Sequence, residues 1–131
     1  MEPKLGPLRQ ICLSCRDLRA SIAWYRDTLG LEFIAEFSPP GIAFFRLGNT
    51  RLMLEAESEN PSSNSVLYFE VADVNAAQQA LEARGVEFDG QPHRIHRDDT
   101  GTFGPVGGEE WMTFFADLDG NTLALAELRV R

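Results

Sequence analysis

The sequence has few cysteines, few histidines and no long apolar run. Among 131 residues there are 2 cysteines and 2 histidines. No stretch reaches the roughly 18 apolar residues that a membrane-spanning helix needs, so we expect no membrane partner. The N-terminus lacks a basic segment followed by an apolar core, so we expect no signal peptide. A reducing, cytoplasmic location is the prediction that fits these absences.

Basic residues are outnumbered by acidic ones. The chain has 12 Lys and Arg residues and 20 Asp and Glu residues, which gives a formal net charge of −8. Such a chain repels phosphates, so nucleic acid is not an expected partner. A chain of this length can bury roughly two-thirds of its unfolded surface, which is enough for a core without disulfide staples.

Both cysteines lie in one Cys-x-x-Cys segment, Cys12 and Cys15. The segment has the alternation of a β-strand, in which positions i and i+3 face opposite sides. The two thiols are therefore predicted to diverge, and one pair without a second pair nearby is weak evidence for zinc. We interpret both as small packed residues.

The clearest pattern is a C-terminal hairpin of two apolar strands, 111–116 and 122–127. Asp119-Gly120 between them indicates a tight turn of type I′ or a related type, because glycine takes positive φ without steric cost. The second strand alternates small and bulky residues in the order Thr122, Leu123, Ala124, Leu125 and Ala126. This alternation predicts a sheet with helices on one face and a cavity on the other.

The preceding chain contains one element order twice. The first half reads as a strand at 8–15, a helix at 18–29, and strands at 31–37, 42–47 and 51–57. The second half reads as a strand at 66–72, a helix from 74 to Gly85, a strand from 86 to about 95, a loop at 98–110, and the hairpin. Asp17 and Asp73 are predicted N-caps. In the strand at 31–37, alternation places Leu31, Phe33, Ala35 and Phe37 on one face.

The two halves match residue by residue, which indicates a duplicated unit. Asp17-Leu18 corresponds to Asp73-Val74, and the run starting at Gly30 (Gly-Leu-Glu-Phe) corresponds to the run starting at Gly85 (Gly-Val-Glu-Phe). We therefore predict an α+β fold with a first module at 8–57, a linker at 58–64 and a second module at 65–128. Together these modules would form one compact domain.

Three motifs resemble the vicinal oxygen chelate superfamily, which includes glyoxalases, bleomycin resistance proteins and dioxygenases. They are Asp17-Leu18, the run from Ser21 to Gly30, and Asp117-Leu118-Asp119-Gly120-Asn121, with Leu118 where the family usually has proline. The resemblance implies two tandem βαβββ modules that form a curved mixed sheet with helices on its outer face. It says less about function, because such folds host many chemistries.

The resemblance also gives the positions where superfamily members carry metal ligands. In this sequence those positions hold Gln10, Glu55, Val66 and Ala124. Valine and alanine cannot bind a metal, and three or four N, O or S ligands are needed. We therefore expect no metal and no other cofactor, as in the metal-free bleomycin-resistance-like members.

Strand alternation predicts which residues line the cavity. The predicted ligand-binding residues are Gln10, Cys12, Ser14, Met53, Glu55, Tyr68, Trp111 and Ala124. Glu55 is the strongest candidate, because a carboxylate on an apolar wall must be solvated, paired or protonated. It would anchor a cationic group or act as a base; the alternative is an open cleft with water at the carboxylate.

His93 and His96 are weaker catalytic candidates. Their segment looks extended, so positions i and i+3 should diverge. We expect one histidine to face solvent and the other to form a local hydrogen bond; the alternative is that one lines the pocket. The glycine-rich loop at 98–110 is interpreted as a lid or as a disordered surface loop.

Two main hypotheses follow. The first is a homodimeric protein that binds a planar or cationic small molecule without a metal. The second is a glyoxalase-like lyase, isomerase or dioxygenase in which Glu55 acts as base or ligand and His93 or His96 assists. A third is a fold retained for protein association.

Overall fold

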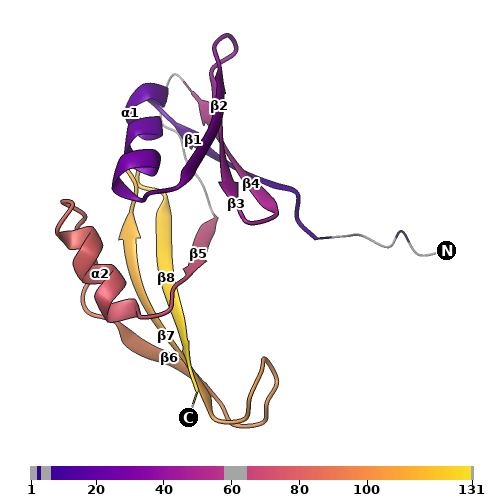
Figure 1. Cartoon of the computed structure of the whole chain (residues 1–131), viewed down its shortest axis with the longest axis vertical. Helices are drawn as coiled ribbons and strands as arrows, with labels where there is room; N and C mark the ends of the chain where they lie inside the picture. The colour runs from indigo at the N-terminus through magenta and orange to yellow at the C-terminus, as the bar shows by residue number, and fades with distance from the viewer. Residues whose placement is uncertain (1–2, 4–6, 58–64, 131) are drawn as a thin grey trace. The chain divides into compact units, whose positions relative to one another are not determined.

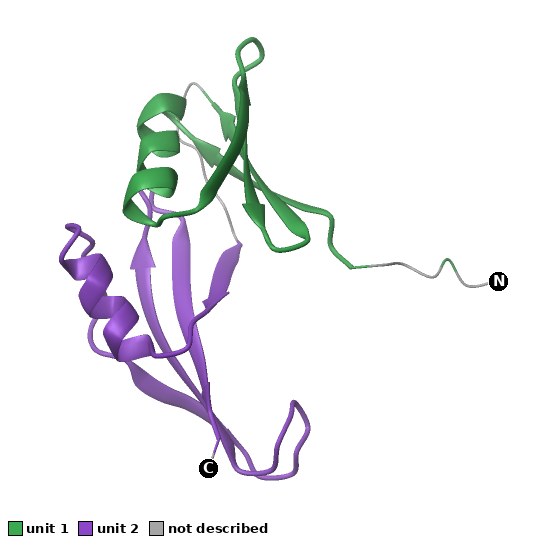
Figure 2. Cartoon of the chain, viewed as in Figure 1, with its two compact units in different colours: residues 1–63 green, residues 64–131 purple. Residues whose placement is uncertain are grey.

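The computed structural model describes residues 3, 7–57 and 65–130. The chain divides into two compact units, Met1–Ser63 and Asn64–Arg131, called unit 1 and unit 2 below (Figure 2). The predicted linker at 58–64 lies outside the described residues. Each unit has the order strand, helix, strand, strand, strand (Figure 1), so the predicted tandem βαβββ modules are confirmed.

The predicted mixed sheet is present as two four-stranded sheets, one in each unit. Unit 1 contains β1 (Gln10–Cys15), α1 (Leu18–Ala23), η1 (Trp24–Thr28), β2 (Glu32–Phe37), β3 (Ile42–Leu47) and β4 (Thr50–Ala56). Unit 2 contains β5 (Val66–Glu70), α2 (Val74–Glu82), β6 (His93–Asp98), β7 (Gly108–Ala116) and β8 (Thr122–Arg129). The strand orders are β1-β4-β3-β2 and β5-β8-β7-β6. The β1–β4 and β5–β8 pairs are parallel and the other pairs are antiparallel.

Both helices begin at the predicted aspartate caps. Asp17 Oδ1 accepts a hydrogen bond from the Ala20 N–H at 3.1 Å, and Asp73 Oδ1 accepts one from the Ala76 N–H at 3.0 Å. Each cap satisfies a backbone donor that has no partner within the helix. The predicted helix at 18–29 is present, but its last part, η1, is a π-helix, and Gly30 follows with φ of 75°. Neither helix of the described chain is long and apolar enough to cross a membrane.

The core of unit 1 lies between α1 and the sheet. Phe45 on β3 is 0% exposed, and its ring packs against Tyr25 of η1 at 5.8 Å and Phe33 of β2 at 5.6 Å between ring centroids. Leu13 of β1 and Leu54 of β4 are register partners and complete this buried face. The alternation of β1 and β4 therefore places their buried leucines under the helix.

The core of unit 2 repeats this arrangement with a polar pair inside it. Phe115 is buried and packs on Phe88 with ring centroids 4.9 Å apart. Thr113 Oγ1 donates a 2.7 Å hydrogen bond to Gln78 Oε1, and Gln78 Nε2 donates to the Gly90 carbonyl at 3.0 Å. These bonds satisfy two buried polar side chains. They tie α2 to β7 and to the loop that follows the helix.

Two β-bulges overturn predicted side-chain directions. In β2 the register shifts between Phe33 and Ala35, so Phe33 pairs with Phe45 while Ala35 pairs with Phe44, the next residue of β3. The prediction that Leu31, Phe33, Ala35 and Phe37 share a face is therefore wrong. A bulge adds one residue to a strand and reverses the alternation beyond it. The second bulge, in β6, is described with the histidines below.

The hairpin turn is centred one residue earlier than the predicted Asp119-Gly120 pair. The Gly120 N–H donates to the Asp117 carbonyl at 3.2 Å, which centres the turn on Leu118 and Asp119, and Gly120 follows with φ of 84°. Glycine does supply the positive φ, but after the central pair instead of within it. The buried Asp117 side chain accepts hydrogen bonds from the N–H groups of Asp119 and Asn121, each at 2.9 Å.

Two predicted boundaries in unit 2 also change. The expected strand from 86 begins at His93, and Phe88 forms only an isolated bridge to Phe115. The expected loop at 98–110 is shorter, because Asp98 ends β6 and β7 already begins at Gly108. Gly108, Glu109 and Glu110 pair with β6 and so belong to β7. The glycines of this segment had predicted a loop there instead.

Candidate functional site

The helix-free face of the unit 1 sheet brings together all five cavity residues predicted from that unit. β1 contributes Gln10, Cys12 and Ser14, and β4 contributes Met53 and Glu55. Cys12 pairs with Met53, and Ser14 pairs with Glu55. These residues alternate with the buried leucines of the same strands, so they lie on the opposite face. Cys15 is buried on the helix side while Cys12 is exposed, as predicted for diverging thiols.

Met53 lies in the middle of this face, between Cys12 on β1 and Phe44 on β3. Gln10 Nε2 lies 3.7 Å from Met53 Sδ. Phe44, the register partner of Met53 on β3, has the Arg51 guanidinium 5.7 Å from its ring centroid. It also meets the Phe37 ring edge-on at 6.0 Å. Cys12, Met53 and Phe44 therefore form a row of polarisable and aromatic groups.

Acidic side chains lie beside that row, because Glu55 follows Met53 by two residues on β4. Glu55 is exposed next to Ser14, whose Oγ donates a 3.0 Å hydrogen bond to Glu57 Oε1. Burial raises the pKa of the Cys12 thiol, and the charges of Glu55 and Glu57 raise it further. The thiol therefore stays protonated at neutral pH, which makes it a poor nucleophile and a poor metal ligand.

On the helix-free face of unit 2, Ala124 has an aromatic neighbour on each side. Ala124 on β8 pairs with Tyr68 on β5 and with Phe114 on β7. The Tyr68 and Phe114 rings meet edge-on with centroids 6.4 Å apart, and Ala124 between them is 0% exposed. Ala124 is thus buried beneath the Tyr68 and Phe114 rings, while the Tyr68 side chain is 57% exposed.

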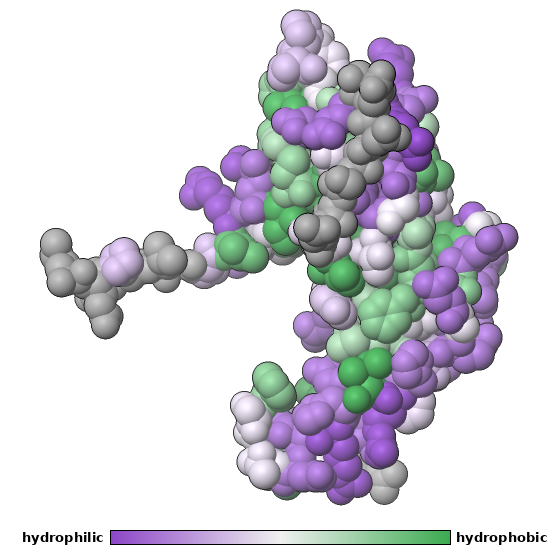
Figure 3. Space-filling model, turned by 180° about the vertical axis from the view of Figure 1, so that it is seen from behind, coloured by the Kyte–Doolittle hydropathy of each residue, from purple (hydrophilic) through white to green (hydrophobic). Residues whose placement is uncertain are grey.

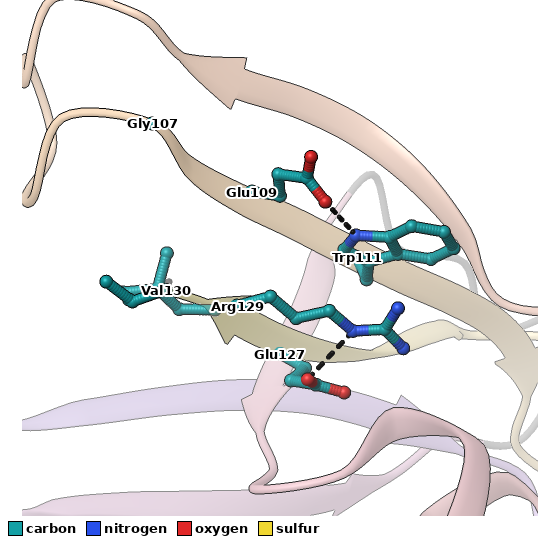
Figure 4. Close-up of a pocket in the computed structure, with 7 residues that line it drawn as sticks. Gly107, Glu109, Trp111, Glu127, Arg129 and Val130 are labelled. Atoms are coloured by element: carbon teal, nitrogen blue, oxygen red, sulfur yellow. Dashed lines mark hydrogen bonds and ion pairs between the residues drawn. The ribbon is translucent and has the colours of Figure 1, made fainter.

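Trp111 lies on the other face of the unit 2 sheet. It pairs with Glu127 and shares the alternation of buried Thr113 and Phe115, so it does not join Tyr68 and Ala124. There it lines a pocket of about 530 Å³ together with Glu109, Glu127 and Arg129 (Figure 4). Sequence reasoning singled out Trp111 but missed the pocket, because Arg129 lies beyond the predicted end of the hairpin.

The two histidines do not diverge. The bulge between Arg94 and His96 makes His93 pair with Met112 and His96 pair with Glu110, which are two residues apart on β7. Both histidines therefore lie on the helix-free face of unit 2, and the predicted divergence is wrong. His93 Nδ1 lies 3.2 Å from the Gln91 carbonyl oxygen, which matches the predicted local hydrogen bond. His96 meets the Phe103 ring edge-on at 5.9 Å.

The residues at the superfamily's metal-ligand positions do not fit a metal. Ala124 lies beneath two rings, and neither Ala124 nor Val66 has a donor atom. Gln10 and Glu55 supply one amide and one carboxylate, fewer than the three or four ligands that such metals need. Within the ranges that the structure describes, no group of three or more His, Cys, Asp or Glu residues could hold a metal ion.

The loop between β6 and β7 is organised by a buried carboxylate. The Asp98 side chain accepts hydrogen bonds from the N–H groups of Thr102 and Phe103, both at 2.8 Å, and of Gly104 at 3.2 Å. The bond from Phe103 contributes most to holding the pKa of the Asp98 carboxyl below its usual value. The Thr102 and Gly104 bonds act in the same direction, and burial opposes them. These bonds attach the loop to the Asp98 side chain at the end of β6.

We expect Asp98→Asn to release this loop at neutral pH, because an amide NH₂ cannot accept the bonds from Phe103 and Gly104. Since the folded pKa is depressed, the wild-type contribution is complete above the unfolded value of about 3.9 and is lost as pH falls through the lower folded value. Hydrogen-exchange protection of the Phe103 amide should fall in the variant. The matched change Asp99→Asn, at an exposed carboxylate bonded to Arg97, should leave it unchanged. Equal hydrogen-exchange protection of the Phe103 amide in Asp98→Asn and Asp99→Asn would contradict the role of Asp98 in holding the loop.

Solved structures with this paired-module fold are similar to the whole chain. A glyoxalase/bleomycin resistance protein/dioxygenase from Nocardioides is 22% identical with a TM-score of 0.73, over 96% of this chain and 85% of that one. Lactoylglutathione lyase from Agrobacterium tumefaciens is 23% identical with a TM-score of 0.68, over 95% of each chain. A superfamily member from Sphaerobacter thermophilus is 20% identical with a TM-score of 0.72, over 94% of this chain and 98% of that one. No curated protein matches the chain. At these identities the likeness concerns the fold.

Sequence comparison gives the family itself. A profile of the Glyoxalase/Bleomycin resistance protein/Dioxygenase superfamily matches residues 8–125. The chain therefore belongs to this superfamily, as the motifs at Asp17, Ser21–Gly30 and Asp117–Asn121 indicated.

Proposed function

We propose that the protein binds a small molecule on the helix-free face of unit 1 without the metal that many superfamily members use. The observation that carries this proposal is the apolar row of Cys12, Met53 and Phe44, with the exposed Glu55 carboxylate beside Met53. A planar group stacks on Phe44 and Met53, and a cationic substituent pairs with Glu55. The missing donors at Val66 and Ala124 support a mechanism that needs no metal.

Exposed aromatic side chains on the helix-free faces support a binding role. Phe37 in unit 1 is 51% exposed, and its ring contacts Phe44. The space-filling view in Figure 3 shows hydrophobic surface next to hydrophilic surface. Apolar surface that carries a few placed polar groups is typical of ligand sites.

Substitution of Glu55 tests the proposal. In a panel of planar aromatic cations, Glu55→Gln should weaken binding about three- to tenfold, the cost of one partly solvated charge pair. Calorimetry with the purified chain measures this, and the bound compound should be recovered unchanged. Glu87→Gln, a change at an exposed carboxylate in unit 2, is the matched control and should have no effect. Equal affinities in the wild type and Glu55→Gln would remove Glu55 from the site.

The alternative is a glyoxalase-like lyase, isomerase or dioxygenase with a non-standard site. The observation that favours it is the β6 bulge, which puts His93 and His96 on one face of unit 2. Two histidines on one exposed face can supply a general acid and a general base. This alternative predicts a modified product instead of unchanged ligand, and loss of turnover in His93→Gln or His96→Gln.

We further propose that the protein acts as a homodimer in the cytoplasm. A symmetric dimer is the commonest oligomer of soluble proteins, and it would bury exposed apolar side chains such as Tyr68. Sedimentation equilibrium of the purified chain tests the dimer, and a monomer at all concentrations would contradict it.

A further inference from the structure

A second candidate site lies on the helix-bearing face of unit 2, at the Trp111 pocket. Arg129 lies over the Trp111 indole, with the guanidinium carbon 4.0 Å from the ring centroid (Figure 4). Arg129 Nε donates a 2.9 Å hydrogen bond to Glu127 Oε2. The Arg129 guanidinium, which is a planar cation, therefore lies on the Trp111 indole and pairs with the Glu127 carboxylate. Here the cation is a side chain of the protein itself.

The two carboxylates of the pocket are held independently of Arg129. Glu127 Oε1 accepts the Val74 N–H of α2 at 2.8 Å, and the Glu127 side chain is 13% exposed. Glu109 accepts the Trp111 Nε1–H at 3.0 Å and pairs with Arg94 at 3.2 Å, and its side chain is 15% exposed. When Arg129 moves away, the indole face and both carboxylates therefore keep their positions.

We propose that this pocket binds a planar organic cation, such as an amidinium or an aromatic ammonium, which takes the place of Arg129 on Trp111. The volume of about 530 Å³ suits a molecule of one or two rings. A cation on a tryptophan face gains from the ring quadrupole, and partial desolvation by the walls strengthens that gain. An anion is disfavoured, because Glu109 and Glu127 line the same space.

Arg129 acts as a competing internal ligand in this arrangement. The apparent affinity for an external cation is reduced by the fraction of chains in which Arg129 covers the indole. Removing the Arg129 side chain ends this competition and makes the net charge of the pocket more negative. Arg129→Ala should therefore bind a planar cation more tightly than the wild type, the opposite of the usual effect of deleting a pocket side chain.

Titration with benzamidinium tests the proposal, with the uncharged isostere benzamide as control ligand. The probe is the Trp111 indole N–H resonance in a ¹H–¹⁵N correlation spectrum of the full chain, assigned with Trp111→Phe. We expect a saturable movement of this resonance with benzamidinium, little with benzamide, and none at Trp24. Affinity should rise about tenfold in Arg129→Ala and fall about threefold in Glu109→Gln.

Matched variants separate this site from the one proposed in unit 1. Arg51→Ala removes the other cation–π contact, on Phe44, and should leave the Trp111 titration unchanged. Glu55→Gln should also leave it unchanged, so failure at one site is distinguishable from failure at the other. The proposal is wrong if neither the wild type nor Arg129→Ala shows a saturable shift, if benzamide shifts the resonance equally, or if Arg129→Ala weakens binding.

Discussion

Phe45→Ala is expected to cost about 3–5 kcal/mol of the free energy of unfolding. Phe45 is fully buried between Tyr25 and Phe33, on the face of the unit 1 sheet that α1 covers. Its removal deletes a large apolar surface and leaves a cavity that the two neighbouring rings cannot fill. Urea unfolding followed by Trp24 fluorescence in a Trp111→Phe background reports on unit 1, because the Trp24 and Tyr25 ring centroids lie 5.0 Å apart.

The adjacent residue provides a matched control. Phe44 has the same chemistry on the same strand, but it lies on the opposite face and is only partly buried. Phe44→Ala should cost less, about 1–2 kcal/mol, and should weaken binding of the planar ligand. If Phe44→Ala and Phe45→Ala lowered the free energy of unfolding equally, the helix-free face would be as tightly packed as the face that α1 covers. That outcome would contradict a binding role for it.

Asp117→Ala is expected to cost about 2–4 kcal/mol, because it removes the acceptor around which the hairpin turn is built. The carboxylate accepts three hydrogen bonds, from the N–H groups of Asp119 and Asn121 at 2.9 Å and from Asn121 Nδ2 at 2.8 Å. Without it, the buried Asn121 donors lose their partner. Thermal unfolding measures the change.

The control for Asp117 lies in the same turn. Leu118 is 53% exposed, so Leu118→Ala should change stability by no more than about 0.5 kcal/mol. If Asp117→Ala were as mild as Leu118→Ala, the turn would be held by its backbone and not by the carboxylate.

Local signals in the sequence predicted much of this fold, because their causes are local. An aspartate before an apolar helical stripe can cap a helix, and Asp17 and Asp73 do so with the same geometry. Alternation in β1 and β4 placed Leu13 and Leu54 in the core and Cys12 and Met53 on the other face. The duplicated motif then fixed the element order of both units.

The wrong predictions concern side-chain directions and contacts that residues distant in the sequence determine. A bulge has no reliable sequence signature, and the extra residue at Ile95 alone changed the direction of His96. Ala124 looked like the lining of a cavity, but the register places Tyr68 and Phe114 beside it and their rings cover it. Buried Asp98 carried no pattern that revealed its bonds to the loop. Cross-strand neighbours of this kind cannot be read from a single strand.

Metal binding is the most direct test of the proposed mechanism. Metal content of the purified, tag-free chain should be well below one ion per chain, and melting with added Zn²⁺, Ni²⁺, Mn²⁺ or Fe²⁺ should show no increase in Tm. A metal that binds only the native state would raise Tm by mass action. One ion per chain with a clear rise in Tm would contradict the account, because it would mean that Gln10, Glu55, Val66 and Ala124 are not the correct set of metal-ligand positions. Glu55, His93 and His96 would then be the first residues to replace.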